Sequence, residues 1–115
     1  MHTVKTLFQK IAEGEIPAEF VYKDDLCFAI RDISPQAPVH VLIIPRKPVP
    51  RVSETTEEDV SLLGHLIVTA GEIARRLGLQ AGFRLVVNNG KQAGETVPHL
   101  HVHLLAGREM SWPPG

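Results

Sequence analysis

The stretch that decides the fold reads Pro98-His99-Leu100-His101-Val102-His103-Leu104-Leu105. Three of the six histidines lie here, two residues apart, and the residues between them are apolar. Alternation with a period of two predicts a β-strand over residues 98–105. Because successive side chains of a strand point to opposite faces, we expect the three imidazoles on one face and the aliphatic side chains on the other. A small substrate group could therefore touch two rings at once.

Three interpretations of this histidine-bearing face are open. It is the polar face of a half-buried strand, a metal site or a catalytic site. Imidazole is a common metal ligand, although the run itself contains no carboxylate or cysteine to complete a zinc site. A neutral imidazole is also a competent nucleophile near neutral pH, and neighbouring rings can orient it and handle protons.

The run from His99 to Leu105 resembles the His-x-His-x-His-x-x signature, with apolar x, of the histidine triad (HIT) superfamily. Further matching segments follow in the same order as in that family: residues 8–17, 24–25, 31–38, 40, 44–45, 87–90, 94–97 and 112–115. The match is most similar to the histidine triad nucleotide-binding protein branch. It implies an α+β HIT-like fold with an antiparallel sheet of about five strands, one short N-terminal helix and one long helix, assembled as a dimer.

Size and composition set further bounds. With 115 residues, 43% apolar and 22% charged, the chain is expected to form a single HIT domain over residues 1–115. A net charge of −1 argues against nucleic acid as the main partner. The single cysteine, Cys27, suits a reducing compartment, and no run approaches the ~18 apolar residues of a membrane span. We therefore expect a cytoplasmic protein without a membrane partner.

Apolar spacing predicts the remaining elements. A short helix is expected over residues 6–13, strands over 20–23, 26–32, 39–45 and 83–88, and a long helix from Thr55 to Leu77. Thr55 and Glu58 have the spacing of a capping box. The apolar stripe of the long helix is wider than one sheet needs, so part of it is expected to pack on a second chain, together with the strand near residues 84–87. Its members are Val60, Leu62, Leu63, Leu66, Ile67, Ala70, Ile73, Ala74 and Leu77.

The resemblance implies a role for each histidine near the site. His101, the middle ring, would attack the α-phosphorus of the substrate. His103 would share a proton or bond the phosphate, and His99 would help to fix the tautomer of its neighbour. His40, a lone histidine in an apolar run, would be a fourth imidazole that positions or buffers the catalytic ring. His65 is expected to be inert, and the basic loop 46–51 is assigned no site.

The resemblance also implies a nucleotide site. Asp32 would bind the ribose hydroxyls, Asn88 the phosphate–ribose link, and the loop 94–97 the phosphate. Apolar side chains would hold the purine base. The nucleotide-binding set is Leu7, Phe8, Ile11, Ile30, Asp32, Ile33, Asn88, Gly94, Glu95, Thr96, Val97, His101 and His103.

The function implied is that of a purine nucleoside phosphoramidase. It would hydrolyse the P–N bond of adenosine or guanosine 5′-phosphoramidates, and acyl-adenylates, through a covalent nucleotidyl-histidine. No metal and no cofactor is expected, because Thr6 and Gln9 stand where some relatives carry a zinc-binding cysteine pair. The alternative is a non-catalytic purine nucleotide-binding regulatory module. The tail around Trp112 would reach the neighbouring subunit's site.

Overall fold

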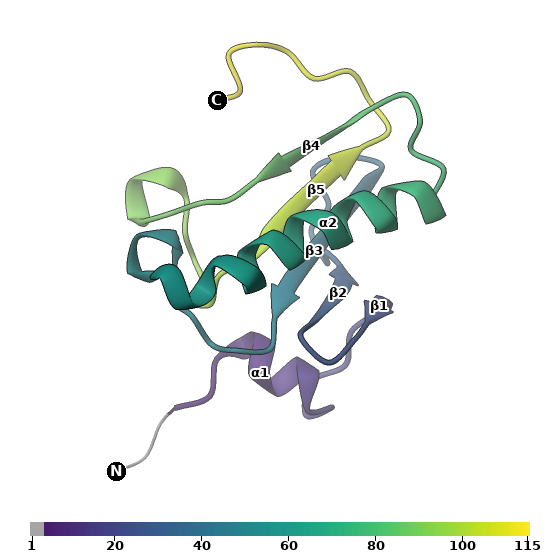
Figure 1. The fold of residues 1–115 in the computed structure, drawn as a ribbon. Helices are drawn as coiled ribbons and strands as arrows, with labels where there is room; N and C mark the ends of the chain where they lie inside the picture. Colours follow the sequence, from purple (N-terminus) through teal and green to yellow (C-terminus); the bar gives the residue numbers. More distant parts are fainter. Residues whose placement is uncertain (1–3) are drawn as a thin grey trace.

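One antiparallel sheet of five strands, in the order β1-β2-β3-β5-β4, organises the fold (Figure 1). The strands are β1 (Phe20–Lys23), β2 (Cys27–Arg31), β3 (Val39–Pro45), β4 (Phe83–Val86) and β5 (Val102–Ala106). The helices are α1 (Leu7–Ala12) and α2 (Val60–Arg76). The structure is a computed structural model that describes residues 4–115, so residues 1–3 of the predicted domain lie outside the described residues.

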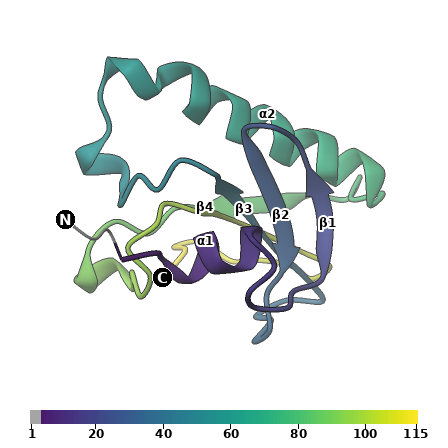
Figure 2. The same cartoon turned by 90° about the horizontal axis from the view of Figure 1, so that it is seen from below.

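The two helices cover opposite faces of the sheet (Figure 2). On one face, α2 buries Leu66, Ala70 and Ile73 against Val41 and Leu104 of β3 and β5. On the other face, α1 buries its apolar side chains in a second, smaller cluster, whose buried members are Phe8, Ile11, Phe28, Ile30, Leu42 and Ile44. The predicted α+β architecture, with a five-stranded antiparallel sheet and one long helix, is confirmed.

The strand predicted over residues 98–105 is shorter than expected. Residues 102–106 form β5, which pairs with β3 from Ile43↔Val102 to Val39↔Ala106. His99 and His101 lie before the strand, because the chain there no longer follows β3: the N–H of Leu100 donates to the carbonyl of Val49, 2.7 Å away. The backbone nevertheless alternates as predicted, so Leu100, Val102 and Leu104 join the α2 core while the histidine rings lie on the α1 face.

The start of the long helix also differs from the prediction. The capping box is formed by Thr56 and Asp59, not by Thr55 and Glu58, and it opens a 3₁₀ turn (Glu57–Asp59) that leads into α2. The buried face of α2 is centred on Leu66 and Ile73. Other members of the predicted stripe remain exposed, among them Val60 at 64% and Ile67 at 50%.

His65, expected to be inert, connects α2 to the turn between β1 and β2. Its Nε2 atom lies 2.6 Å from Oδ2 of Asp24. The same carboxylate accepts from the Tyr22 hydroxyl and from the N–H groups of Leu26 and Cys27. These bonds, together with the contact to His65, lower the pKa of Asp24 in spite of its partial burial. Within residues 4–115, no helix combines the length and apolar character that crossing a membrane requires.

Candidate active site

Four histidine rings gather on the α1 face of the sheet. His101 and His103 have ring centroids 4.9 Å apart, and His103 and His40 have centroids 5.2 Å apart. Phe8 of α1 contacts the edges of His99 and His101, at 5.6 and 5.0 Å between centroids. Three separate parts of the chain thus meet at one place: α1, β3 and residues 99–103.

The orientation of His101 is set by the main chain. Its Nδ1 atom lies 2.8 Å from the carbonyl oxygen of His99. Because a carbonyl can only accept a hydrogen bond, Nδ1 carries the proton of the neutral ring. The Nε2 atom of His101 then bears the lone pair, and the ring lines a cavity. This is the tautomer that a nucleophilic imidazole needs.

The tautomer of His103 is set by a relay of two bonds. The backbone N–H of Gln36 donates to Nδ1 of His40, at 3.0 Å, so the proton of His40 resides on Nε2. That Nε2 lies 2.9 Å from Nδ1 of His103 and donates to it. The proton of neutral His103 is therefore on its Nε2 atom. Burial, followed by the nearby rings of His101 and His40, lowers the pKa of His103 to about 4.

His99 is fully buried and contacts the site through Phe8 and His101 without lining the cavity. Its Nε2 atom lies 2.7 Å from the carbonyl oxygen of Pro45, and its Nδ1 atom lies 2.6 Å from Oγ1 of Thr6. The carbonyl fixes the proton on Nε2, so the Thr6 hydroxyl donates to Nδ1. Burial lowers the pKa of His99, which keeps the ring neutral at pH 7.

A cavity of about 330 Å³ opens beside His101 and His103. Its apolar lining comes largely from α1 and from residues 16–18 before β1, and its polar lining includes the two rings, Asp32 and Thr96. Ile33 is 97% exposed on its rim. The Asp32 carboxylate accepts from the N–H of Ser34 at 2.7 Å and lies 3.5 Å from Nε2 of His40. The predicted residues that line this cavity are Leu7, Phe8, Ile11, Ile30, Asp32, Ile33, Thr96, Val97, His101 and His103.

Asn88, Gly94 and Glu95 do not line the cavity. The backbone N–H groups of Gly94 and Glu95, which were expected to face a phosphate, donate instead to Lys91 and Gly90 within the loop. Gly94 has φ +93°, a backbone conformation that favours glycine, and Asn88 lies beside it. The loop is folded on itself around a 3₁₀ turn (Lys91–Ala93), so Thr96 and Val97 are the members of the predicted phosphate loop that reach the cavity.

Six further residues line the cavity and were not predicted: Ile16, Pro17, Ala18, Arg31, Ser34 and Leu42. Arg51, which lies outside the cavity lining, makes a contact that was not predicted either. Its guanidinium forms two parallel hydrogen bonds with the Glu95 carboxylate, at 2.9 and 3.0 Å. Opposite charges 44 residues apart, in a chain with 12 basic and 13 acidic residues, give no signal of a specific pair.

Two clusters of side chains carry donors suited to a metal ion among residues 4–115. One is Asp32, His40 and His103 at the candidate site, and the other is Asp24, Cys27 and His65 on the α2 side. The donor atoms of each cluster lie within 4.8 Å of one another. In the first cluster, the facing nitrogens of His40 and His103 share a hydrogen bond, so a metal ion there would have to displace that proton.

Comparison with known proteins relates this geometry to a family. The HIT domain family matches residues 13–110. A HIT-like protein of Synechocystis sp. is 59% identical over 110 residues, which cover 96% of both chains. The crystal structure of a HIT family hydrolase from Legionella pneumophila superposes with a TM-score of 0.94 at 46% identity, covering 96% of this chain and 100% of that one.

A more distant structure is that of a histidine triad nucleotide-binding protein from Candida albicans. It superposes with a TM-score of 0.80 at 27% identity and covers 95% of this chain and 83% of its own. The matches extend over nearly the whole sequence and include the segment that carries the three histidines. The chain therefore belongs to the HIT domain family.

Proposed function

We propose that this protein is a hydrolase of the histidine triad nucleotide-binding branch, acting on purine nucleoside 5′-phosphoramidates and acyl-adenylates. The observation that carries the proposal is the state of His101. Its Nδ1 proton is held by the His99 carbonyl, and its Nε2 lone pair belongs to a ring that lines the cavity. The names of the Legionella pneumophila and Candida albicans relatives, a hydrolase and a nucleotide-binding protein, support the same reading.

The cavity has the two kinds of surface that a nucleotide needs. Phe8, Ile11 and Ile30 offer an apolar wall for a purine base, and the Asp32 carboxylate can accept hydrogen bonds from ribose hydroxyls. Thr96 lines the same cavity as His101 and His103, and its hydroxyl can donate to a phosphate oxygen bound there. These features support a bound nucleoside phosphate whose α-phosphorus faces His101.

The proposed reaction has two displacements at that phosphorus. In the first, Nε2 of His101 forms a bond to phosphorus, the P–N bond of the substrate breaks, and the departing nitrogen takes a proton from solvent. In the second, the oxygen of water forms a bond to phosphorus, the bond to Nε2 of His101 breaks, and the water returns a proton to solvent as the nucleoside monophosphate and neutral His101 are released. Splitting one difficult displacement in two is the advantage of a covalent intermediate. The Nε2–H of His103 can donate to a phosphoryl oxygen or to the departing nitrogen.

The test is turnover of an adenosine 5′-phosphoramidate carrying a fluorescent amine, in the presence of EDTA. We expect the parent to release the amine and His101→Ala to lose at least about 10³-fold in rate. Adenosine monophosphate binding, measured on the same two proteins, shows whether the cavity is intact. Phe83→Leu, on the edge strand β4 and outside the cavity lining, serves as a control for substitution itself.

Two results would contradict the proposal. If the parent binds adenosine monophosphate but releases no amine, the protein is a purine nucleotide-binding module without turnover. If amine release requires a divalent metal and EDTA abolishes it, the histidines act as ligands, with Asp32, His40 and His103 as the donors to examine first.

A further inference from the structure

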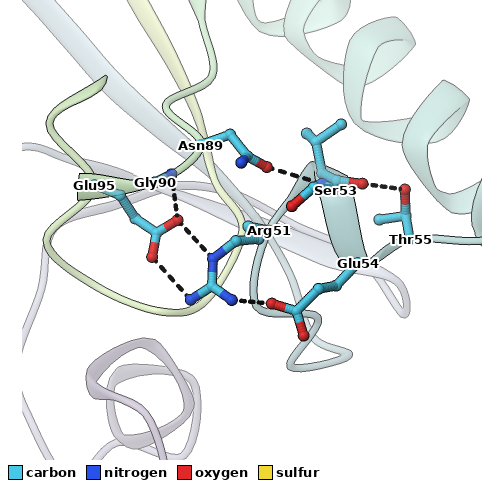
Figure 3. Close-up of polar contacts among 8 residues, drawn as sticks. Arg51, Ser53, Glu54, Thr55, Asn89, Gly90 and Glu95 are labelled. Atoms are coloured by element: carbon cyan, nitrogen blue, oxygen red, sulfur yellow. Dashed lines mark hydrogen bonds and ion pairs between the residues drawn. The ribbon is translucent and has the colours of Figure 1, made fainter. Parts of the chain in front are cut away.

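The contact between Arg51 and Glu95 joins two segments that frame the candidate site. Nε and Nη2 of Arg51 lie 2.9 and 3.0 Å from the two carboxylate oxygens of Glu95 (Figure 3). The third guanidinium nitrogen, Nη1, bonds Glu54, so the planar group is held from two sides. Two parallel N–H···O bonds fix the orientation of a side chain more strictly than a single ion pair does.

Glu95 also holds its own loop together. Its Oε1 atom accepts from the backbone N–H of Gly90 at 3.0 Å, and its side chain is 12% exposed. A second bond between the same two segments runs from the N–H of Ser53 to the Asn89 side chain, at 2.8 Å (Figure 3). Segment 51–54 is thus hydrogen-bonded to loop 89–95 at two points, and the Glu95 carboxylate is at the centre of the network.

The ion pair of Arg51 and Glu95 lies just outside the cavity. Neither Arg51 nor Glu95 lines it, yet Thr96 and Val97, the next residues along the chain, do. The position of the Thr96 hydroxyl therefore depends on how Glu95 is held. The Arg51 guanidinium, helped by the Gly90 N–H, lowers the pKa of Glu95 to about 2, so Glu95 is ionised at pH 7. An ionised carboxylate this close to a phosphate site repels the ligand unless it is neutralised.

We propose that Arg51 is a positioning residue for phosphate recognition. Its bidentate bond to Glu95 fixes the loop that presents Thr96 to the phosphate and neutralises the carboxylate next to that site. The inference rests on the proposed function, because it assumes that a nucleoside phosphate occupies the cavity. It differs from that function in naming a residue that touches neither the ligand nor the reacting atoms.

The test compares ligands with and without a phosphate. Adenosine monophosphate and adenosine are titrated into the parent, Arg51→Gln, Arg51→Gln/Glu95→Gln, and the control Lys47→Gln. Lys47 forms an ion pair with Asp59 at 2.7 Å in the same connecting segment but does not contact loop 89–95. We expect Arg51→Gln to weaken adenosine monophosphate about tenfold and to leave adenosine unchanged. The double variant should recover most of the loss, because glutamine keeps the bond to Gly90 and removes the charge.

Two outcomes would overturn the inference: equal weakening of both ligands by Arg51→Gln, or an effect no larger than that of Lys47→Gln. If Arg51→Gln does not fold, Arg51→Lys replaces it, since lysine keeps the charge and loses the paired bonds. Amide hydrogen exchange at Gly90 tests the loop without any ligand. If exchange is faster in the Arg51 variant but the parent binds no ligand, Arg51 holds the loop and the proposed function is contradicted. Unchanged exchange would show that Arg51 does not hold the loop.

Discussion

The Nε2 atom of His40 lies 2.9 Å from Nδ1 of His103, and the direction of the proton between them is set by a main-chain amide. The N–H of Gln36 occupies the other nitrogen of His40, so His40 must be the donor. A loop residue before β3 therefore decides which nitrogen of a cavity-lining ring carries a proton.

Removing His40 should impair turnover through His103. In His40→Ala, Nδ1 of His103 loses its donor and the ring can adopt the other tautomer, whose Nε2 no longer donates. We expect kcat to fall by about 10- to 100-fold with little change in KM. His40→Gln, whose amide can still donate to Nδ1, should recover part of the loss. Equal kcat values for the two variants would refute the relay.

Thr6 should matter for stability because one hydroxyl has two tasks. It accepts from the N–H of Gln9 at the start of α1, and it bonds Nδ1 of buried His99. In Thr6→Val the helix cap is lost and a buried nitrogen is left without a partner, so we expect a loss of about 2–3 kcal/mol in the free energy of unfolding. Thr6→Ser is the matched control. Urea unfolding measures both, and a Val variant as stable as the Ser variant would contradict the prediction.

The lowered pKa of His103 predicts a specific pH dependence of stability. Its pKa is about 4 in the folded protein against 6.5 for the model compound, so the unfolded chain takes up a proton first as the pH falls. Stability is therefore complete above pH 6.5 and declines between 6.5 and about 4. Unfolding free energies at about pH 7.5 and about pH 5 should differ by about 1–2 kcal/mol. The difference should shrink in His103→Gln; an undiminished difference would assign the effect to other groups.

The proposed homodimer has a direct test. Strand β4 lies at the edge of the sheet, where its outer hydrogen-bonding groups face outward, and Val60 and Ile67 of α2 are 64% and 50% exposed. We expect the parent to sediment as two chains at micromolar concentration and Ile67→Glu to shift the mass toward one chain. Glu58→Ala, at the already polar start of the helix, should leave the mass unchanged. A sedimentation mass of one chain for the parent would contradict the proposed homodimer.

The sequence predicted the elements whose apolar pattern is strong. Strand β3 was correct at both ends because Val39 to Pro45 is almost continuously apolar. The prediction that the three imidazoles and the aliphatic side chains lie on opposite faces was also correct, although His99 and His101 precede β5. An extended backbone alternates its side chains whether or not it pairs with another strand. What could not be predicted were contacts made by side chains far apart in sequence. The contact of Arg51 with Glu95 depends on how two loops meet, and that of His65 with Asp24 depends on how α2 packs over the β1–β2 turn; no local pattern encodes either.

The carbonyl that orients His101 has a consequence for the second half of the proposed reaction. In serine hydrolases a carboxylate holds the imidazole and stabilises its positive charge. Here a neutral main-chain dipole at 2.8 Å takes that place. A nucleotidylated imidazole carries positive charge, and a dipole compensates it less than a carboxylate would. In the proposed reaction His101 would thereby remain a good leaving group, so that water would release the nucleotide and the covalent intermediate would not become a trap.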